Sequence, residues 1–198
     1  MIWWQLVHAG AGSMLTAIIA THESERTLVP TLAALVPGVT CGLLREVIVA
    51  DAGSRDATAE VAEIAGCRFI GSSEPLGARL RAAAATTRTP WLLFLRAGCA
   101  PEPAWIHAAE RFMQAADLAE RAAVFRQTGE GQATALPQLL ALLRAAIAGP
   151  RPEQGLLIAR RFYDVLGGHT GEDAETALLR KLGRRRIALL ACGATAPR

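Results

Sequence analysis

The sequence predicts an α/β fold in which a mostly parallel central sheet is flanked by helices. Short runs of β-branched and bulky apolar residues alternate with longer helical patterns, an order typical of βαβ units. The expected strand interiors are almost continuously apolar, which is typical of a parallel sheet covered by helices on both faces. The expected strands are 15–20, 46–50, 68–70, 91–95, 123–126 and 155–159, and the expected helices are 26–36, 57–65, 76–86 and 102–116.

Polar turns follow three of the first four expected strands. They are residues 21–23 after the first strand, 51–54 after the second and 96–98 after the fourth. In open α/β sheets, ligands bind outside the carboxyl ends of the strands. These turns are therefore the first candidates for a binding site. Further on, two prolines separate the helix-like segment 136–148 from the last expected strand.

The composition is that of a globular protein. Of the 198 residues, 52% are apolar and 20% are charged, and the length fits one domain. The net charge of +3 is modest, and no nucleic-acid motif accompanies the C-terminal arginines, so we expect no nucleic-acid partner. The four cysteines are scattered and indicate neither a zinc site nor a disulfide framework. No apolar stretch is long enough to span a bilayer, and we expect a cytoplasmic protein.

The first thirteen residues match nothing in the α/β pattern. We expect residues 1–13 to be a loose N-terminal tail and residues 14–198 to be one domain. The glycines at 10 and 12 do not form a dinucleotide loop, because the strand follows them instead of preceding them. Two readings of the tail stay open: an authentic segment, or an early start codon with Met14 as the true beginning.

The turn after the second expected strand carries the clearest chemical signal. Asp51 stands at the last position of a buried strand, where a carboxylate is costly unless a polar group meets it. A nucleotide base or ribose would meet it, so we expect Asp51 to be without a partner in the empty protein. Asp56 is expected only to cap the helix that follows.

Three of these segments, taken together, resemble family 2 glycosyltransferases of the GT-A type. That family has a strand followed by a Pro-Thr-Tyr-like turn, then an Asp-Asp-Gly-Ser turn, then a Phe-Leu-Asp-x-Asp turn. Residues 17–24, 51–54 and 94–98 occupy these three places, and order and spacing agree from about residue 14 to residue 115. The resemblance implies a GT-A-like fold, a nucleoside-diphosphate sugar as donor, and hexosyl transfer to a hydroxyl acceptor.

The resemblance also assigns roles on the donor side. It implies that Thr21, His22 and Asp51 hold the nucleoside, and that Arg79 and Arg96 contact the diphosphate. Arg79 stands where the family has a Gly-x-x-Arg element, and the planar guanidinium suits two phosphate oxygens at once. The alternative for Arg79 is a solvated helix face.

A further segment resembles the acceptor half of the family. Gly167-Gly168-His169 precedes the acidic pair Glu172-Asp173, as a Gly-Gly-Phe turn precedes an acidic pair in the family. The resemblance implies that Asp173 is the general base for the acceptor hydroxyl, with inversion at the anomeric carbon. The alternative is that the two carboxylates only favour a helix N-terminus. His169 is expected to be a loop residue.

The chain departs from the family at the metal-binding turn. The family's two aspartates, which hold Mg²⁺ or Mn²⁺ against the diphosphate, are replaced by Arg96 and Gly98. Because a cationic side chain repels a metal, we expect no metal cofactor and instead a contact from Arg96 to the diphosphate. The alternative is a catalytically degenerate protein that binds nucleotide, or serves as an interaction partner, on the same fold.

The acceptor is not identified by the sequence. A lipid-linked hydroxyl is one candidate, with peripheral membrane contact through segment 136–148 and the arginines at 184–186. Packing in the core is the alternative for segment 136–148.

Overall fold

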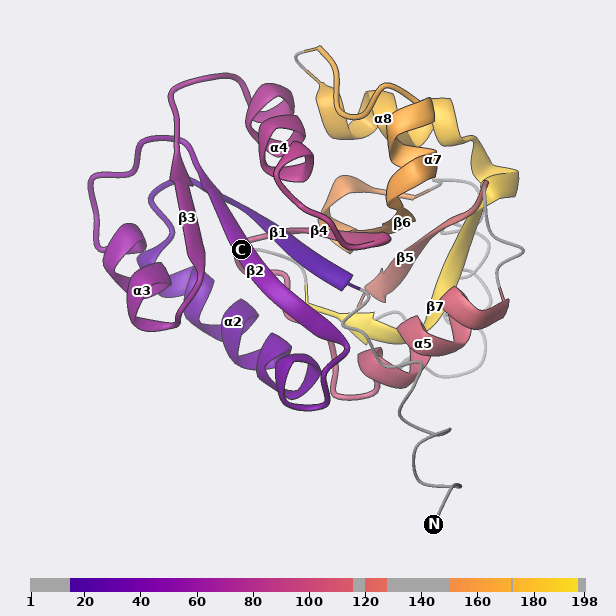
Figure 1. Ribbon diagram of the computed structural model, residues 1–198, viewed down its shortest axis with the longest axis horizontal. Helices are drawn as coiled ribbons and strands as arrows, with labels where there is room; N and C mark the ends of the chain where they lie inside the picture. The colour runs from indigo at the N-terminus through magenta and orange to yellow at the C-terminus, as the bar shows by residue number, and fades with distance from the viewer. Residues whose placement is uncertain (1–14, 116–119, 128–149, 172, 196–198) are drawn as a thin grey trace, which may run out of the picture.

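The computed structural model describes residues 15–115, 120–127, 150–171 and 173–195. These residues form a seven-stranded sheet in the order β3-β2-β1-β4-β6-β5-β7, with helices on both faces (Figure 1). The strands are β1 (Leu15–Thr21), β2 (Leu44–Asp51), β3 (Arg68–Gly71), β4 (Trp91–Arg96), β5 (Ala122–Gln127), β6 (Leu156–Ala159) and β7 (Ile187–Ala194). The α-helices are α2 (Glu25–Thr40), α3 (Thr58–Ile64), α4 (Leu76–Ala85), α5 (Trp105–Ala115), α7 (Arg160–Val165) and α8 (Ala174–Leu182), and the 3-10 helices are η1 (Pro152–Gln154) and η2 (Arg184–Arg186).

The sheet is mostly parallel, as predicted. Strand β1 pairs in parallel with both β2 and β4, β2 pairs in parallel with β3, and β5 pairs in parallel with β7. Only β6 runs antiparallel to its neighbours, β4 and β5, within the described residues. The strand order reverses between β1 and β4, and in sheets of this kind that reversal marks the ligand-binding crevice.

Figure 1 shows α2, α3 and α5 on one face of the sheet and α4, α7 and α8 on the other. Chain order explains this division. The chain steps outward from β1 to β2 to β3 and then returns to β4 on the other side of β1. Because parallel crossovers keep one hand, the helices of the outward steps and the helix of the return step cover opposite faces.

The core is built on β1 and its two neighbours. Leu15, Ile18 and Ile19 are completely buried, as a strand covered on both faces requires. Below the sheet, Trp105 anchors α5 against α2, and its indole N–H donates a 3.0 Å hydrogen bond to the Ala34 carbonyl. The two helices approach so closely that only a glycine fits at position 38, since a Cβ there would lie 2.5 Å from the Trp105 ring.

The sequence prediction placed six strands and missed the seventh. Strand β7 contains alanine, cysteine and glycine, which are weak strand signals, and it follows an arginine run. The predicted tail at 1–13 and the helix-like segment 136–148 lie outside the described residues. Among the residues that are described, no helix is long and apolar enough to cross a membrane.

Candidate functional site

Three predicted site residues lie at one edge of the sheet. Thr21 ends β1, Asp51 ends β2 and Arg96 ends β4. In the register, Thr21 is opposite Asp51, and Ala20 is opposite Arg96. Asp51 and Arg96 therefore lie on the two strands that flank β1. Neighbouring strands are about 4.8 Å apart. The prediction that both residues occupy carboxyl ends on the same edge of the sheet is confirmed.

Asp51 is buried, and the protein itself satisfies its carboxylate. Its Oδ1 accepts hydrogen bonds from Thr21 Oγ1 at 2.7 Å and Ser54 Oγ at 2.6 Å. Its Oδ2 accepts from the backbone N–H groups of Gly53 at 2.8 Å and Ser54 at 2.7 Å. The expectation that Asp51 has no partner in the empty protein is therefore wrong. With two bonds at each oxygen, the carboxylate fixes the turn that follows β2.

The acid stability of the protein is expected to depend on Asp51. Burial alone would raise the pKa of this carboxyl, but hydrogen bonds from Ser54, Thr21 and Gly53 outweigh it and hold the pKa below the ordinary value of 3.8. A depressed pKa contributes stability above the unfolded value, and this contribution is lost as the pH falls through the folded value. Melting temperatures measured from neutral pH down to about pH 3 should therefore fall in acid.

Asp51→Asn provides the comparison, because an amide NH₂ cannot accept the bonds from Gly53 and Ser54. We expect this variant to be about 1–3 kcal/mol less stable at neutral pH. Its melting temperature should also change less between pH 5 and pH 3 than that of the wild type. If the melting temperatures of the two proteins fall equally between pH 5 and pH 3, another titrating group controls the loss of stability in acid.

The turns after β1 and β2 are tied to each other. Glu23 N donates to Ser54 Oγ at 2.8 Å, and Arg55 N donates to Glu23 Oε1 at 2.9 Å. Glu23 has a φ of 48°, the one positive φ found at a non-glycine residue among those described. The two hydrogen bonds hold it in this uncommon conformation. His22 is exposed beside this joined pair of turns.

Arg79 lies buried under the same edge and is not on a solvated helix face. Its Nη1 donates to the carbonyls of Ala50 at 2.6 Å and Thr21 at 3.4 Å, and its Nε donates to the Glu74 carbonyl at 3.1 Å. Burial lowers the pKa of Arg79, and the charge of Asp51 partly opposes that shift. Its Nη2 has no hydrogen bond to any described residue, so part of the guanidinium is still available to a ligand.

Arg96 is held by two glutamates that come from the other end of the chain. It forms an ion pair with Glu175 of α8, including a 3.0 Å bond from Nε to Oε2, and Nη1 lies 4.0 Å from Glu153 Oε1 in η1. The hydrogen bond to Glu175 is the main reason that the pKa of Arg96 is raised. The side chain of Glu175 is 12% exposed, against 37% for Arg96. The pairing joins the end of β4 to α8 and η1.

Sequence reasoning missed both of these glutamates. Glu175 lies two residues beyond the acidic pair and Glu153 lies next to a proline, and neither position carries a pattern of its own. Only the approach of α8 and η1 to the end of β4 identifies them. A general clue was present, because a half-buried arginine at a strand end needs a nearby carboxylate.

Asp173 lies at the N-terminal boundary of α8 and is exposed. Its side chain makes no capping hydrogen bond, although its carbonyl accepts one from Ala177 N at 2.8 Å. This position is the one expected if the carboxylate only favours a helix N-terminus, so that alternative to a general base stays open. Glu172, its partner in the predicted acidic pair, lies outside the described residues.

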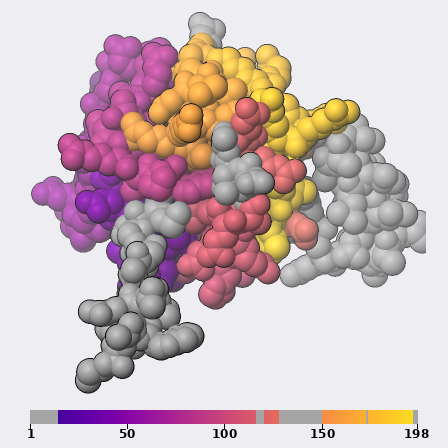
Figure 2. Space-filling view, turned by 45° about the vertical axis from the view of Figure 1, so that its right-hand side comes forward, coloured from indigo at the N-terminus to yellow at the C-terminus, as the bar shows by residue number. Residues whose placement is uncertain are grey.

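Helix α8 packs closely against α4. Figure 2 shows the orange-to-yellow part of the chain, which contains α8, beside the magenta part that contains α4. At Gly77 in α4, a Cβ would lie 2.6 Å from Ala174 Cβ and 3.3 Å from the Gly171 carbonyl oxygen. The glycine at this position therefore sets the distance between α4 and α8.

Gly77→Ala is expected to destabilise the protein by about 1–3 kcal/mol, because the added methyl overpacks the contact between the helices. Thermal unfolding measures this as a drop of about 2–4 °C per kcal/mol. The matched control is Gly77→Ala combined with Ala174→Gly, which removes the methyl that clashes. The double variant should regain part of the loss, and a double variant as unstable as the single one would contradict the packing explanation.

His169 lies in the loop between α7 and α8, as expected from the sequence, but its side chain is buried in the core. It is 1% exposed, and its Nδ1 lies 2.9 Å from the Tyr163 hydroxyl. Its ring packs edge-on against Phe94, with centroids 4.7 Å apart. Burial lowers the pKa of His169 to about 4, so the ring is neutral at physiological pH. The Gly-Gly-His segment thus anchors the start of α8 onto β4.

Solved structures of one enzyme share the fold of this chain. Glucosyl-3-phosphoglycerate synthase from Mycobacterium tuberculosis, in complex with Mg²⁺ and UDP, aligns with a TM-score of 0.70 at 22% identity over 98% of this chain and 75% of that chain. The same enzyme with Mn²⁺ and UDP-glucose gives 0.69 at 23% identity, over 98% and 74%. With Mn²⁺, UDP and glucosyl-3-phosphoglycerate it gives 0.69 at 21% identity, over 95% and 73%. These similarities show a common fold.

The expectation that no metal cofactor is involved is overturned by these structures, which hold Mn²⁺ or Mg²⁺ together with UDP or UDP-glucose. The turn at Arg96 itself does not fit a divalent cation. Arg96 and Gly98 supply no carboxylate, and the Glu102 carboxylate faces β7, where it accepts a 2.8 Å bond from Gly193 N. No three His, Cys, Asp or Glu side chains gather into a metal site within the described part of the chain. A cation bound with the donor would need ligands from outside this turn.

The sequence of the chain also matches the model of a known protein family. The model for glycosyl transferase family 2 matches residues 16–149, which include the turns after β1, β2 and β4. No protein with a curated description matches the chain. The mostly parallel sheet flanked by helices is the architecture that the sequence predicted, although the seventh strand was not foreseen. The chain therefore belongs to glycosyl transferase family 2 and has the GT-A fold.

Proposed function

We propose that this protein transfers a sugar from a nucleoside-diphosphate sugar to a hydroxyl acceptor. One observation carries the proposal: the Asp51 turn and Arg96 lie on the strands that flank β1, where the strand order of a family 2 sheet reverses. Ligands of open α/β sheets bind at such switch points. The synthases of similar fold are described with UDP or UDP-glucose, which supports a donor of this class.

On the donor side, we assign the residues to two tasks. Thr21 donates a hydrogen bond to Asp51, and Asp51 also accepts hydrogen bonds from the Gly53–Ser54 turn. These two residues therefore shape the turn that would hold the nucleoside. His22 is exposed beside that turn and is free to contact the nucleoside. The diphosphate would meet Arg96 and the remaining Nη2 of Arg79. Guanidinium groups suit this task because they stay charged and offer parallel donors.

On the acceptor side, Asp173 is our candidate for the general base. Its carboxylate is exposed at the start of α8 and makes no hydrogen bond or ion pair with the residues described. In the reaction it would accept the proton of the acceptor hydroxyl while that oxygen attacks the anomeric carbon. The bond from the anomeric carbon to the diphosphate oxygen breaks, and the nucleoside diphosphate leaves with the electron pair. Direct displacement of this kind inverts the anomeric configuration.

A second candidate function is nucleotide binding without transfer. It is favoured by the pairing of Arg96 with Glu175 and Glu153, which uses the charge that would otherwise meet the diphosphate. For transfer to occur, the diphosphate must compete with these carboxylates for the guanidinium.

Turnover of a panel of nucleoside-diphosphate sugars separates the two functions. Release of nucleoside diphosphate is measured with Mg²⁺ or Mn²⁺ present, first with water and then with hydroxyl acceptors. Transfer predicts that at least one donor is consumed and that its sugar appears on the acceptor with inverted configuration. Saturable donor binding without any release would support the second function, and the absence of both binding and release would refute the proposal.

A further inference from the structure

The solvent side of α2 is apolar beyond the first turn of the helix. Its exposed residues there, apart from one threonine, form what we call the apolar face of α2: Val29, Pro30, Ala33, Val36, Pro37 and Val39. The three valines are 52%, 55% and 49% exposed. No charged side chain occurs between residues 27 and 44, so no charge interrupts this face. A contiguous exposed apolar surface of this kind marks a place where another segment or molecule packs.

Helix α2 does not need the apolar face for its own packing in the fold. The opposite side of the helix carries Leu28 and Leu35, which are buried, and Trp105 of α5 packs against Gly38. Valine is also a weaker helix former than alanine or a charged residue with a long side chain. Valines on the solvent side are therefore explained by a partner that covers them.

Residues 1–14 join the fold beside one end of α2. Leu15, the first residue of β1, donates its backbone N–H to the Leu43 carbonyl at 3.2 Å. Helix α2 ends three residues before Leu43, at Thr40, a separation of at most about 11 Å. Fourteen extended residues reach about 46 Å, whereas the sixteen residues of α2 span about 24 Å. The segment before β1 is therefore long enough to follow α2 from end to end.

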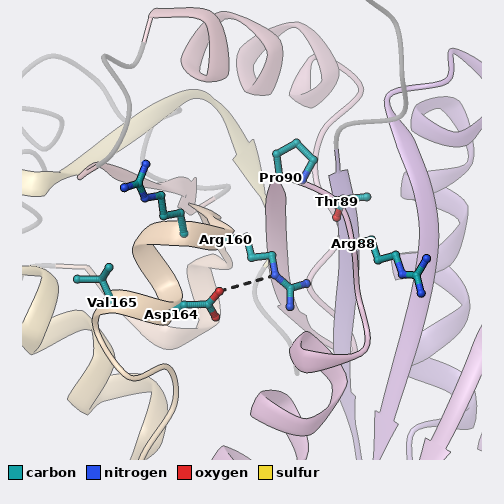
Figure 3. Close-up of a pocket in the computed structure, with 7 residues that line it drawn as sticks. Arg88, Thr89, Pro90, Arg160, Asp164 and Val165 are labelled. Carbon is teal, nitrogen blue, oxygen red and sulfur yellow. Dashed lines mark ion pairs between the residues drawn. The ribbon is translucent and has the colours of Figure 1, made fainter.

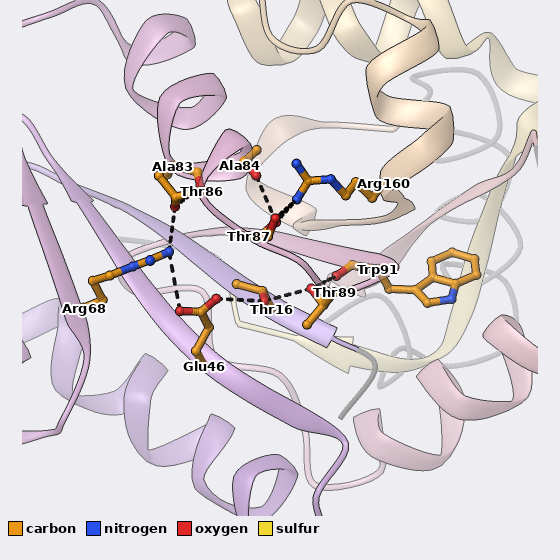
Figure 4. Close-up of polar contacts among 10 residues, drawn as sticks. All are labelled: Thr16, Glu46, Arg68, Ala83, Ala84, Thr86, Thr87, Thr89, Trp91 and Arg160. Carbon is orange, nitrogen blue, oxygen red and sulfur yellow. Dashed lines mark hydrogen bonds and ion pairs between the residues drawn. The ribbon is translucent and has the colours of Figure 1, made fainter. Parts of the chain in front are cut away.

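Buried hydrogen bonds fix the point at which this segment joins the sheet. Thr16, the second residue of β1, accepts a 2.8 Å hydrogen bond from Thr89 and donates one to Glu46 at 3.4 Å (Figure 4). Glu46 also pairs with Arg68 at 3.4 Å. Both threonines are buried. A fixed attachment point beside α2 raises the effective concentration of the attached segment at the apolar face.

The other face of the sheet is polar at this end. Leu15 is opposite Trp91 in the register, and the loop before Trp91 borders an open depression (Figure 3). Its lining includes Arg88 and Arg160, and Arg160 Nε lies 3.7 Å from Asp164 Oδ2. An apolar segment laid there would remove charged groups from water without offering them a partner. Polarity therefore favours the direction toward α2.

We propose that residues 1–14 pack along the apolar face of α2. The segment includes Trp3, Trp4 and Leu6 and contains no Asp, Glu, Lys or Arg, which suits an uncharged surface. Each tryptophan can bury about 150–250 Å². Because the segment belongs to the same chain, its packing avoids the entropy cost of bringing two molecules together. The proposal does not depend on the sugar-transfer reaction.

Nuclear Overhauser contacts in the full chain test the packing directly. We expect cross-peaks between the rings of Trp3 and Trp4 and the valine methyl groups of the apolar face. A loose tail, which the sequence alone led us to expect, would give no such cross-peaks and would overturn the proposal. A mixed sample of differently labelled chains shows whether the contacts lie within one molecule. Cross-peaks found only between different copies would assign the face to a second copy and would also overturn the proposal.

Val36→Asp places a charge in the middle of the apolar face and should release the segment. Acrylamide quenching of tryptophan fluorescence reports the release, because Trp91 and Trp105 are at most 5% exposed. Two of the four tryptophans lie in the segment, so the accessible fraction of the fluorescence should rise from a small value to about one half. An accessible fraction of about one half already in the wild type would contradict the packing.

The matched control is Val165→Asp, the same substitution at a valine of α7 that is 77% exposed. It adds the same charge on the other face of the sheet and should leave the accessible fraction at the wild-type value. An equal rise in both variants would reduce the effect to net charge and overturn the proposal. Melting temperatures establish that both variants are folded, and the cross-peaks of the wild type decide the question if Val36→Asp does not fold.

Discussion

Replacing Asp173 with asparagine is expected to slow sugar transfer by about 10²–10⁴-fold, the usual contribution of a positioned general base. Asparagine keeps the shape of the side chain but cannot accept the acceptor proton. Because Asp173 makes no capping bond and is exposed, the melting temperature should not change. Donor affinity should also stay the same, since the residue is assigned to the acceptor side. The transfer rate and the calorimetric affinity for the donor are measured on the same preparation.

Two further variants show whether the effect belongs to this carboxylate. Glu63→Gln removes an exposed carboxylate from α3 and should leave the transfer rate unchanged. Glu175→Gln removes the charge that pairs with Arg96. It should change the affinity for the donor and leave the pH dependence of transfer close to that of the wild type. If Asp173→Asn retains the wild-type rate, the proton is taken by another group.

Arg96→Ala is expected to lower the affinity for nucleoside diphosphate about 10–150-fold, which corresponds to the loss of a charge-assisted hydrogen bond of about 1.5–3 kcal/mol. The same change should lower stability, because Glu175 is only 12% exposed and loses its cationic partner. The stability loss should be at the lower end of about 1–3 kcal/mol, since solvent screens the half-exposed guanidinium. Calorimetric titration and thermal unfolding measure the two effects separately.

A double variant separates the structural role of Arg96 from its role in binding. Arg96→Ala combined with Glu175→Ala removes both charges and should recover much of the stability while affinity stays low. Arg96→Lys keeps the charge without the fork and should bind with intermediate affinity. Wild-type affinity in the double variant would show that Arg96 only holds α8 against β4.

The first half of the sheet was predictable because it depends on local sequence. Strands β1, β2 and β4 are uninterrupted apolar runs that end at polar turns, and one hydrophobic pattern fixes each of them. Asp51 was predicted to be a site residue from its place at a strand end, and its position at the carboxyl end of β2 is as predicted. Its four hydrogen bonds, from Thr21, Gly53 and Ser54, were not foreseen, although Gly53 and Ser54 stand only two and three positions after it and such Asx turns are common.

The contacts between distant segments were not predictable. The pairing of Arg96 with Glu175 joins residues 79 positions apart, and it depends on how α8 reaches the end of β4. Arg79 has the sequence signature of an exposed helix residue, yet strand carbonyls bury its guanidinium. His169 stands where the family often has an aromatic residue, and it performs that packing role as a neutral ring. In each case tertiary packing decides the role.

The most direct test of the donor site is to map where a nucleoside diphosphate binds. Amide NMR of the full chain is recorded with and without UDP, in buffer that contains Mg²⁺. The proposed function predicts saturable shifts that cluster at the turns 21–24, 52–55 and 96–98, all at the carboxyl edge of the parallel strands. Saturable shifts clustered at any other part of the sheet, or no shifts with UDP or any other nucleoside diphosphate, would contradict a donor site at this edge.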